Sequence, residues 1–164
     1  MCIYEMASFY PQNALAHSNL GNSFRNAGLV DEAIGEYKLA LSLDPDYAKD
    51  YNGLGVCYLE KTMPGEAIRA FQKALALDPK LLPAYNNLGS ALGDKGLYAE
   101  AAVYFNRAIN IDRKYVPAYN GLGITYARLK KINDAKRIWE EALKINPEDP
   151  AVRENLEKLK KIGY

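Results

Sequence analysis

The chain has 164 residues, of which 49% are hydrophobic and 25% are charged, a composition typical of globular rather than disordered proteins. The formal net charge of +1 provides no strong single-sign field for binding nucleic acid or an anionic membrane. No apolar run approaches the roughly 20 residues that a membrane span needs, so we expect no direct membrane insertion. No signal peptide is visible at the start, which leaves the compartment unknown and favours the cytoplasm only weakly.

A short phrase recurs at a fixed interval along the chain. It reads Tyr-Asn-Asn-Leu-Gly at 85–89 and Tyr-Asn-Gly-Leu-Gly at 51–55 and 119–123, with a weaker copy at 17–21. The copies begin at positions 17, 51, 85 and 119, so each follows the one before it by the same distance in sequence. A period of this size indicates stacked supersecondary units rather than one closed core.

Residues 1–12 have the pattern of the second helix of a unit whose first helix is missing. Ile3, Met6 and Phe9 have helical apolar spacing, and Pro11 closes the segment. Such a half-unit would expose a stacking face, so a homo-oligomer formed through it is one alternative for the function of the chain.

Four full units follow, each predicted to be a pair of antiparallel helices, and they cover 14–47, 48–81, 82–115 and 116–149. In the first unit, Gly28 ends one helix and Asp31 is expected to cap the next. In the second unit, Thr62 stands in the turn as a plausible cap and Pro64 at a first helical turn. Residues 150–162 form a single amphipathic helix that would cap the last unit.

Large aromatic and small residues alternate at fixed positions of the repeat. The predicted wedges between units are Tyr37, Phe71, Phe105 and Trp139, and the glycines expected to let paired helices approach are Gly21, Gly55, Gly89 and Gly123. Gly53 and Gly121 add a second glycine to two helices. Close approach of a partner's backbone and tolerated sequence drift are both open explanations for this second glycine.

The pattern aromatic-x-x-Leu-Gly-x-x-Tyr, then Ala-x-x-x-Phe-x-x-Ala-Leu, then Asp-Pro resembles the tetratricopeptide repeat (TPR). The resemblance covers essentially the whole chain, 1–164. It implies an all-α fold, a TPR solenoid in which antiparallel helix pairs of about 34 residues each form one right-handed superhelix. It also implies a non-enzymatic adaptor or scaffold that binds an extended peptide or a helix of another protein on its concave face.

In that family, the first helix of each pair lines the concave face. The register gives these peptide-binding candidates: Asn19, Asn22, Arg25, Lys49, Asn52, Val56, Leu59, Asn86, Asn87, Asn120, Ile124 and Arg128. Ser18, Asn26, Gly53, Glu60, Ser90, Asp94 and Gly121 fall on the same face. Asparagine is frequent in this set, and its amide can pair with a peptide group in either direction. The alternative is that these amides bond to the neighbouring unit.

No catalytic, cofactor or metal site is predicted. His17 is the only histidine and stands where the other units have tyrosine, so we interpret it as a packing residue. Cys2 and Cys57 lack metal-ligand spacing and are expected to be reduced thiols. Nucleic acid is not expected as a partner, because the candidate face mixes cations with Glu60 and Asp94. A targeting region of a larger enzyme is a further alternative.

Overall fold

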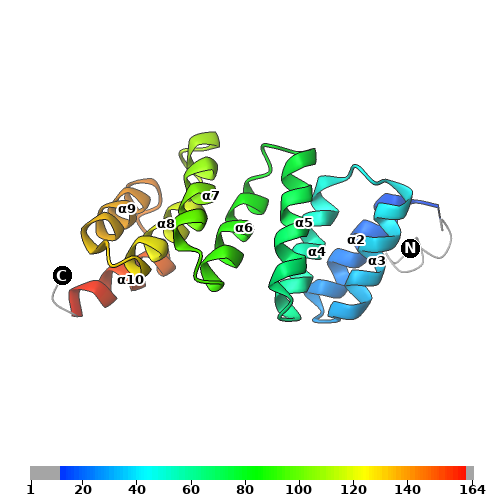
Figure 1. Ribbon diagram of the computed structural model, residues 1–164, viewed down its shortest axis with the longest axis horizontal. Helices are drawn as coiled ribbons and strands as arrows, with labels where there is room; N and C mark the ends of the chain where they lie inside the picture. Colours follow the sequence, from blue (N-terminus) through cyan, green and yellow to red (C-terminus); the bar gives the residue numbers. More distant parts are fainter. Residues whose placement is uncertain (1–11, 162–164) are drawn as a thin grey trace. The chain divides into compact units, whose positions relative to one another are not determined.

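The computed structural model describes residues 12–161, which contain nine α-helices and no β-strand (Figure 1). The helices are α2 (Ala14–Asn26), α3 (Val30–Leu43), α4 (Ala48–Glu60), α5 (Pro64–Leu77), α6 (Leu82–Asp94), α7 (Tyr98–Ile111), α8 (Val116–Arg128), α9 (Ile132–Ile145) and α10 (Pro150–Lys161). Helices α2, α4, α6, α8 and α10 begin at equal intervals along the chain, in the period of the recurring phrase. The all-α prediction is confirmed. The predicted half-unit at 1–12 lies, apart from its last residue, outside the described residues.

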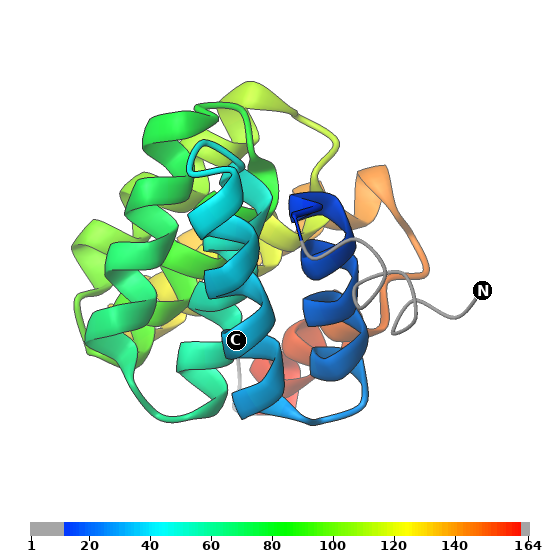
Figure 2. The same cartoon turned by 90° about the vertical axis from the view of Figure 1, so that its right-hand side faces the viewer.

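The chain divides into two compact units, an N-terminal unit (Met1–Ala84) and a C-terminal unit (Tyr85–Tyr164). In the N-terminal unit, α4 packs against α3 and α5 and also contacts α2. Figure 2 shows α2 and α3 lying side by side. In the C-terminal unit, α8 packs against α7 and α9, and α10 covers α8 and α9. Each unit therefore builds its core from helices that are neighbours in sequence.

The two helices of each pair are joined by a tight turn with one residue in the left-handed region. These residues are Gly28 (φ 77°), Thr62 (φ 56°), Gly96 (φ 78°) and Lys130 (φ 60°). In the first turn, the Leu29 N–H donates to the Phe24 carbonyl at 2.9 Å, which closes the end of α2. Two of the four turns thus adopt this conformation without a glycine.

The two predicted helix caps are wrong. The residue that precedes α3 is Leu29 and the one that precedes α5 is Met63, and neither provides a side-chain cap. Asp31 lies instead inside the first turn of α3, where a negative charge complements the helix dipole. The Thr62 hydroxyl donates to the carbonyl of the preceding residue at 2.7 Å. Pro64 does begin α5, as expected.

The longer connections between helix pairs share the same side-chain hydrogen bond to the backbone. The residue after each second helix accepts a hydrogen bond on its side-chain oxygen from the backbone N–H two residues on, and these residues are Asp44, Asp78, Asp112 and Asn146. An Asx turn of this kind reverses the chain direction between two helices, so no additional helix or strand is needed in the connection. The Asp-Pro phrase at 44–45 and 78–79 therefore marks the end of a second helix, and Asp112 and Asn146 mark the same point without the complete phrase.

The predicted aromatic wedges are buried, and they explain the second glycine in α4 and α8. A Cβ added to Gly53 would lie 2.6 Å from the Tyr37 ring, and one added to Gly121 would lie 2.3 Å from the Phe105 ring. Gly53 and Gly121 therefore admit the aromatic ring of the preceding pair. Neither a partner's backbone nor sequence drift is needed to account for them.

Candidate functional site

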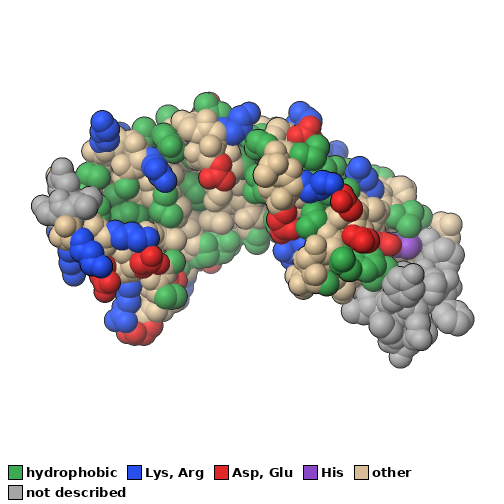
Figure 3. Space-filling model, turned by 90° about the horizontal axis from the view of Figure 1, so that it is seen from below, with side chains coloured by type: hydrophobic (Ala, Val, Ile, Leu, Met, Phe, Trp, Pro, Cys, Tyr) green, Lys and Arg blue, Asp and Glu red, His purple; other side chains and the backbone are tan. Residues whose placement is uncertain are grey.

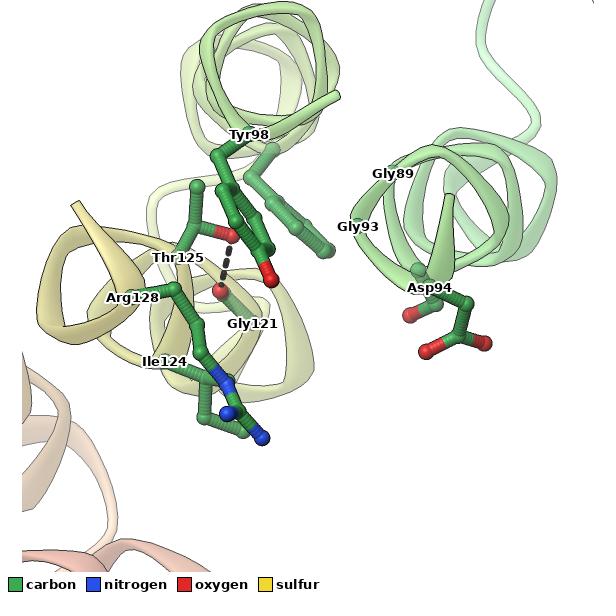
Figure 4. Close-up of a pocket in the computed structure, with 10 residues that line it drawn as sticks. Gly89, Gly93, Asp94, Tyr98, Gly121, Ile124, Thr125 and Arg128 are labelled. Atoms are coloured by element: carbon green, nitrogen blue, oxygen red, sulfur yellow. Dashed lines mark hydrogen bonds between the residues drawn. The ribbon is translucent and has the colours of Figure 1, made fainter. Parts of the chain in front are cut away.

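A cavity of about 350 Å³ opens between α6, α7 and α8 of the C-terminal unit (Figure 4). Its lining residues are Gly89, Ser90, Gly93, Asp94, Tyr98, Phe105, Gly121, Ile124, Thr125 and Arg128. All ten belong to the same unit. We name this space the first cavity.

Glycines on facing helices leave the first cavity open. The Phe105 ring rests on Gly89 of α6 and Gly121 of α8, where added Cβ atoms would lie 2.8 and 2.3 Å from it. The ring thereby forms the floor. At Gly93, an added Cβ would meet no atom within 4 Å, so any side chain there would project into open space. The missing side chain of Gly93 is what keeps the α6 wall recessed.

Polar groups stand around the mouth of the first cavity. In Figure 4, Tyr98 points its hydroxyl toward the opening between α6 and α8, with Asp94 on the α6 side and Arg128 on the α8 side. Neither Asp94 nor Arg128 forms an ion pair with another of residues 12–161. The Thr125 hydroxyl donates to the Gly121 carbonyl at 2.8 Å, so its proton is already used within the chain. The rim therefore offers one charge of each sign to a ligand.

A second cavity, of about 450 Å³, lies between α8, α9 and α10. It is lined by Ile124, Ala127, Arg128, Ile132, Trp139, Asn155, Lys158 and Leu159. Ile124 and Arg128 line both cavities, so α8 forms the ridge between them. Trp139 is held over Gly123, and its indole N–H donates to the Asn120 carbonyl at 3.3 Å.

The same part of the N-terminal unit is occupied by the chain's own polar side chains. Asn22, Arg25 and Tyr37 stand two periods before Ser90, Gly93 and Phe105. The Tyr37 hydroxyl donates to Asn22 Oδ1 at 2.9 Å, and the Asn22 amide donates to the Ser18 carbonyl at 3.0 Å. Burial raises the pKa of Tyr37, although the Arg25 guanidinium beside it acts in the opposite direction. Arg25, which stands where the other unit has Gly93, lies beside Tyr37, and its Nε is buried without a hydrogen-bond partner.

A buried carboxyl lies deeper in the N-terminal unit. Asp50 of α4 is 2% exposed and accepts a hydrogen bond from the Ser18 hydroxyl of α2 at 2.5 Å. Burial raises the pKa of Asp50 to about 6, even though the hydrogen bond from Ser18 lowers it. The equivalent residues of the other helix pairs, one or two periods away in sequence, are Ala16, Ala84 and Ala118. Asp50 is therefore a polar exception at a core position.

His17 lies beside an acidic side chain, as the purple histidine in Figure 3 shows. Its Nδ1 is 2.7 Å from Glu36 Oε2, and the residue is 5% exposed. Among residues 12–161, no group of three or more His, Cys, Asp or Glu side chains could hold a metal ion. Cys57 is a free, buried thiol whose pKa burial raises to about 11, far from the range of a reactive thiolate.

The predicted peptide-binding residues differ in their surroundings: some line cavities, some are hydrogen-bonded within the chain, and others are exposed or partly buried. Ile124 and Arg128 line cavities, whereas the amides of Asn22 and Asn120 are bonded within the chain, Asn120 Oδ1 accepting from Asn155 at 2.8 Å. Asn19 and Lys49 are exposed. The partly buried candidates are Arg25, Asn52, Val56, Leu59, Asn86 and Asn87.

Sequence reasoning missed Gly93 and Tyr98 as cavity residues. Gly93 follows Gly89 by one helical turn, and this repetition of glycine on one helix face was the available signal. Tyr98 begins a second helix and was outside the set of first-helix residues that the register selected. The second cavity was also missed, because its lining includes the capping helix.

The surface carries mixed charges in each unit (Figure 3). In the C-terminal unit, Lys and Arg side chains lie among Asp and Glu side chains close to the chain end, including the pair Lys158–Glu154 at 2.7 Å. None of the helices described, α2–α10, combines the length and apolar character needed to cross a membrane.

Three family models match the chain. Two are described as tetratricopeptide repeat and match residues 94–159 and 48–81, and one described as TPR repeat matches residues 21–61. No sequence among curated proteins matches the chain significantly.

Solved structures with similar folds cover most of the chain. The crystal structure of MamA protein is 25% identical over 89% of this chain and 80% of its own, with a TM-score of 0.78. A structure from the functional characterization of Pseudomonas aeruginosa pilF is 28% identical over 89% of this chain and 67% of its own, with a TM-score of 0.83. The first TPR domain of human RPAP3 is 26% identical over 71% of this chain and 92% of its own, with a TM-score of 0.68.

Proposed function

The chain belongs to the tetratricopeptide repeat family of protein-interaction modules, and from this premise we propose that it is a non-enzymatic adaptor. Its C-terminal unit binds a segment of another protein in the groove between α6 and α8. The observation that supports this proposal is the first cavity, whose α6 wall is recessed at Gly93. The first cavity combines the aromatic floor of Phe105 with polar side chains around its mouth, so it can hold an apolar group and fix its orientation.

The rim of the groove suits a peptide rather than a small rigid ligand. Tyr98 presents a hydroxyl that can donate to or accept from a peptide group, and Asp94 and Arg128 can pair with side chains of either sign. Asn86 stands one helical turn before Ser90 on α6 and so lies on the same side of that helix, next to the first cavity. In the proposed complex, the Asn86 amide contacts the backbone of the bound peptide, and the first cavity accepts one of its side chains.

The test is selection from a displayed library of random peptides against the full chain, followed by affinity measurement with the variant Gly93→Leu. Leucine at this position would fill the first cavity, so we expect the selected peptides to lose at least about tenfold in affinity. Gly35→Leu is the matched control, because Gly35 is also a helical glycine with no atom within 4 Å of an added Cβ. Equal affinity of both variants for the peptides would overturn the proposal.

A further inference from the structure

The two cavities of the C-terminal unit lie on either side of one ridge, which suggests a ligand longer than one side chain. Ile124 and Arg128 of α8 line both spaces. Ile124 is 41% exposed, so the ridge presents an apolar surface as well as a charge. A chain that crosses α8 would contact both cavities without a gap.

Resting on the proposed function, we infer that the ligand is an extended segment with two large apolar side chains and an acidic residue between them. The first apolar side chain enters the first cavity above Phe105, and the second enters the second cavity. The acidic residue faces Arg128, which has no ion-pair partner among residues 12–161.

The second cavity has the lining that an apolar side chain requires. Ile132 of α9, Trp139 of α9 and Leu159 of α10 contribute apolar walls. Trp139 is fixed by its hydrogen bond to Asn120, so this wall exists before a ligand arrives. A preformed wall lowers the entropy lost on binding.

The charges along the groove give the segment a direction. Asp94 stands at the outer rim of the first cavity, Arg128 on the ridge and Lys158 at the second cavity. Lys158 already pairs with Glu154, but the two side chains are 64% and 65% exposed, and such a pair is easily exchanged. A basic residue on the Asp94 side and acidic residues toward Arg128 and Lys158 therefore fit this order.

The spacing of the two apolar side chains follows from ordinary geometry. Packed helices lie about 8–10 Å apart, and an extended chain advances about 3.3 Å per residue. Cavities on opposite sides of one helix are thus spanned by about three residues. The expected pattern is a basic residue, an apolar residue, an acidic residue and a second apolar residue about three positions after the first.

The first experiment repeats the library selection with the charge on the ridge reversed. The unmodified chain is expected to select an acidic residue between two apolar ones, and Arg128→Glu to select a basic residue at that position. Lys144→Glu, an exposed change on α9 that lines neither cavity, is the control and should leave the selected pattern as it is. An unchanged pattern with Arg128→Glu would overturn the inference.

The second experiment uses Trp139, the only tryptophan in the chain, as a reporter of the second cavity. A selected peptide should change the tryptophan emission. Replacing its second apolar residue by glycine should abolish that change and lower affinity about tenfold or more. Replacing the first apolar residue should lower affinity and leave the emission change at saturation. A peptide that binds with no change in emission would overturn the two-cavity arrangement.

The proposed function and this inference fail in different ways. If no peptide is selected, or if Gly93→Leu and Gly35→Leu bind equally, the groove is not a peptide site and both fail. If Gly93→Leu abolishes binding while Arg128→Glu leaves the selected sequences unchanged, the groove is a peptide site, but the ligand chemistry given above is wrong.

Discussion

The two units use the same helix-pair scaffold but treat the space over the aromatic ring differently. In the N-terminal unit, Arg25 lies beside Tyr37, and the Tyr37 hydroxyl donates to Asn22. In the C-terminal unit, Gly93 and Phe105 leave the space open as a cavity. Both rings lie against a pair of glycines, one on each flanking first helix. The scaffold is therefore set by the ring and its glycines, and the residues one turn further along decide whether a site forms.

The charged and polar side chains of the two units differ less sharply. The N-terminal unit directs polar groups toward one another, as in Ser18–Asp50 and His17–Glu36. The C-terminal unit leaves Asp94 and Arg128 without ion-pair partners in the part of the chain that the structure describes. Arg25 of the N-terminal unit also lacks an ion pair among residues 12–161, and its Nε is buried without a hydrogen-bond partner. The C-terminal unit differs in that its unpaired charges stand at the mouth of the first cavity.

Removing the ring should have the largest effect on this comparison. Phe105→Ala is expected to lower the free energy of unfolding by about 3–5 kcal/mol, because it empties the space between Gly89 and Gly121. Urea unfolding followed by circular dichroism would measure it. Val103→Ala on the same helix, where the side chain is 49% exposed, should change the value by no more than about 0.5 kcal/mol. Similar losses for both variants would mean that the ring does not support the groove.

The next effect should be confined to the N-terminal unit and depend on pH. The pKa of Asp50 is raised from 3.8 to about 6, so folding favours its protonated form. This contribution to stability is present below about pH 4 and is lost as the pH rises through about 6. At about 1.4 kcal/mol per pKa unit, the loss is on the order of 3 kcal/mol above pH 7.

Asp50→Asn should therefore stabilise the chain above pH 7 and have little effect near pH 4, in urea unfolding performed across that range. The asparagine oxygen can still accept the hydrogen bond of Ser18. Asp46→Asn, at an exposed position of the same unit, should show no such trend. A stability difference that does not vary with pH would contradict the raised pKa.

The smallest effect concerns single glycines within the helices. Gly121→Ala is expected to destabilise by about 1–3 kcal/mol, because the new Cβ would overlap the buried Phe105 ring. Gly35→Ala should instead stabilise by up to about 1 kcal/mol, since nothing lies near it and alanine favours the helix. Thermal unfolding of the two variants should move in opposite directions. A gain for both would show that the ring can shift at little cost.

The sequence was sufficient to predict the helices, their pairing and the aromatic positions, because each of these repeats at a constant interval. The turn positions were predictable for the same reason, but two caps were not. Asp31 and Thr62 have the residue types of caps, yet the turn with one left-handed residue places the helix starts at different positions.

The site was less predictable because it depends on departures from the repeat. Register placed Asp94, Ile124 and Arg128 on one face, and these residues do line the first cavity. Register could not show that Asn22 and Asn120 bond within the chain, since their partners Tyr37 and Asn155 come from other helices. It also could not tell that Gly53 and Gly121 face an aromatic ring rather than solvent, because that depends on how closely neighbouring pairs pack.

The four left-handed turn residues differ in how much they cost the stability of their helix pairs. Gly28 and Gly96 adopt their conformation freely, whereas Thr62 and Lys130 hold a β-carbon where one costs roughly 1–2 kcal/mol. The second and fourth helix pairs are therefore destabilised at the turn between their two helices. A more stable version of this scaffold would begin with a glycine at Thr62, which lies in the N-terminal unit, because Lys130 stands only two residues after Arg128 of the proposed site.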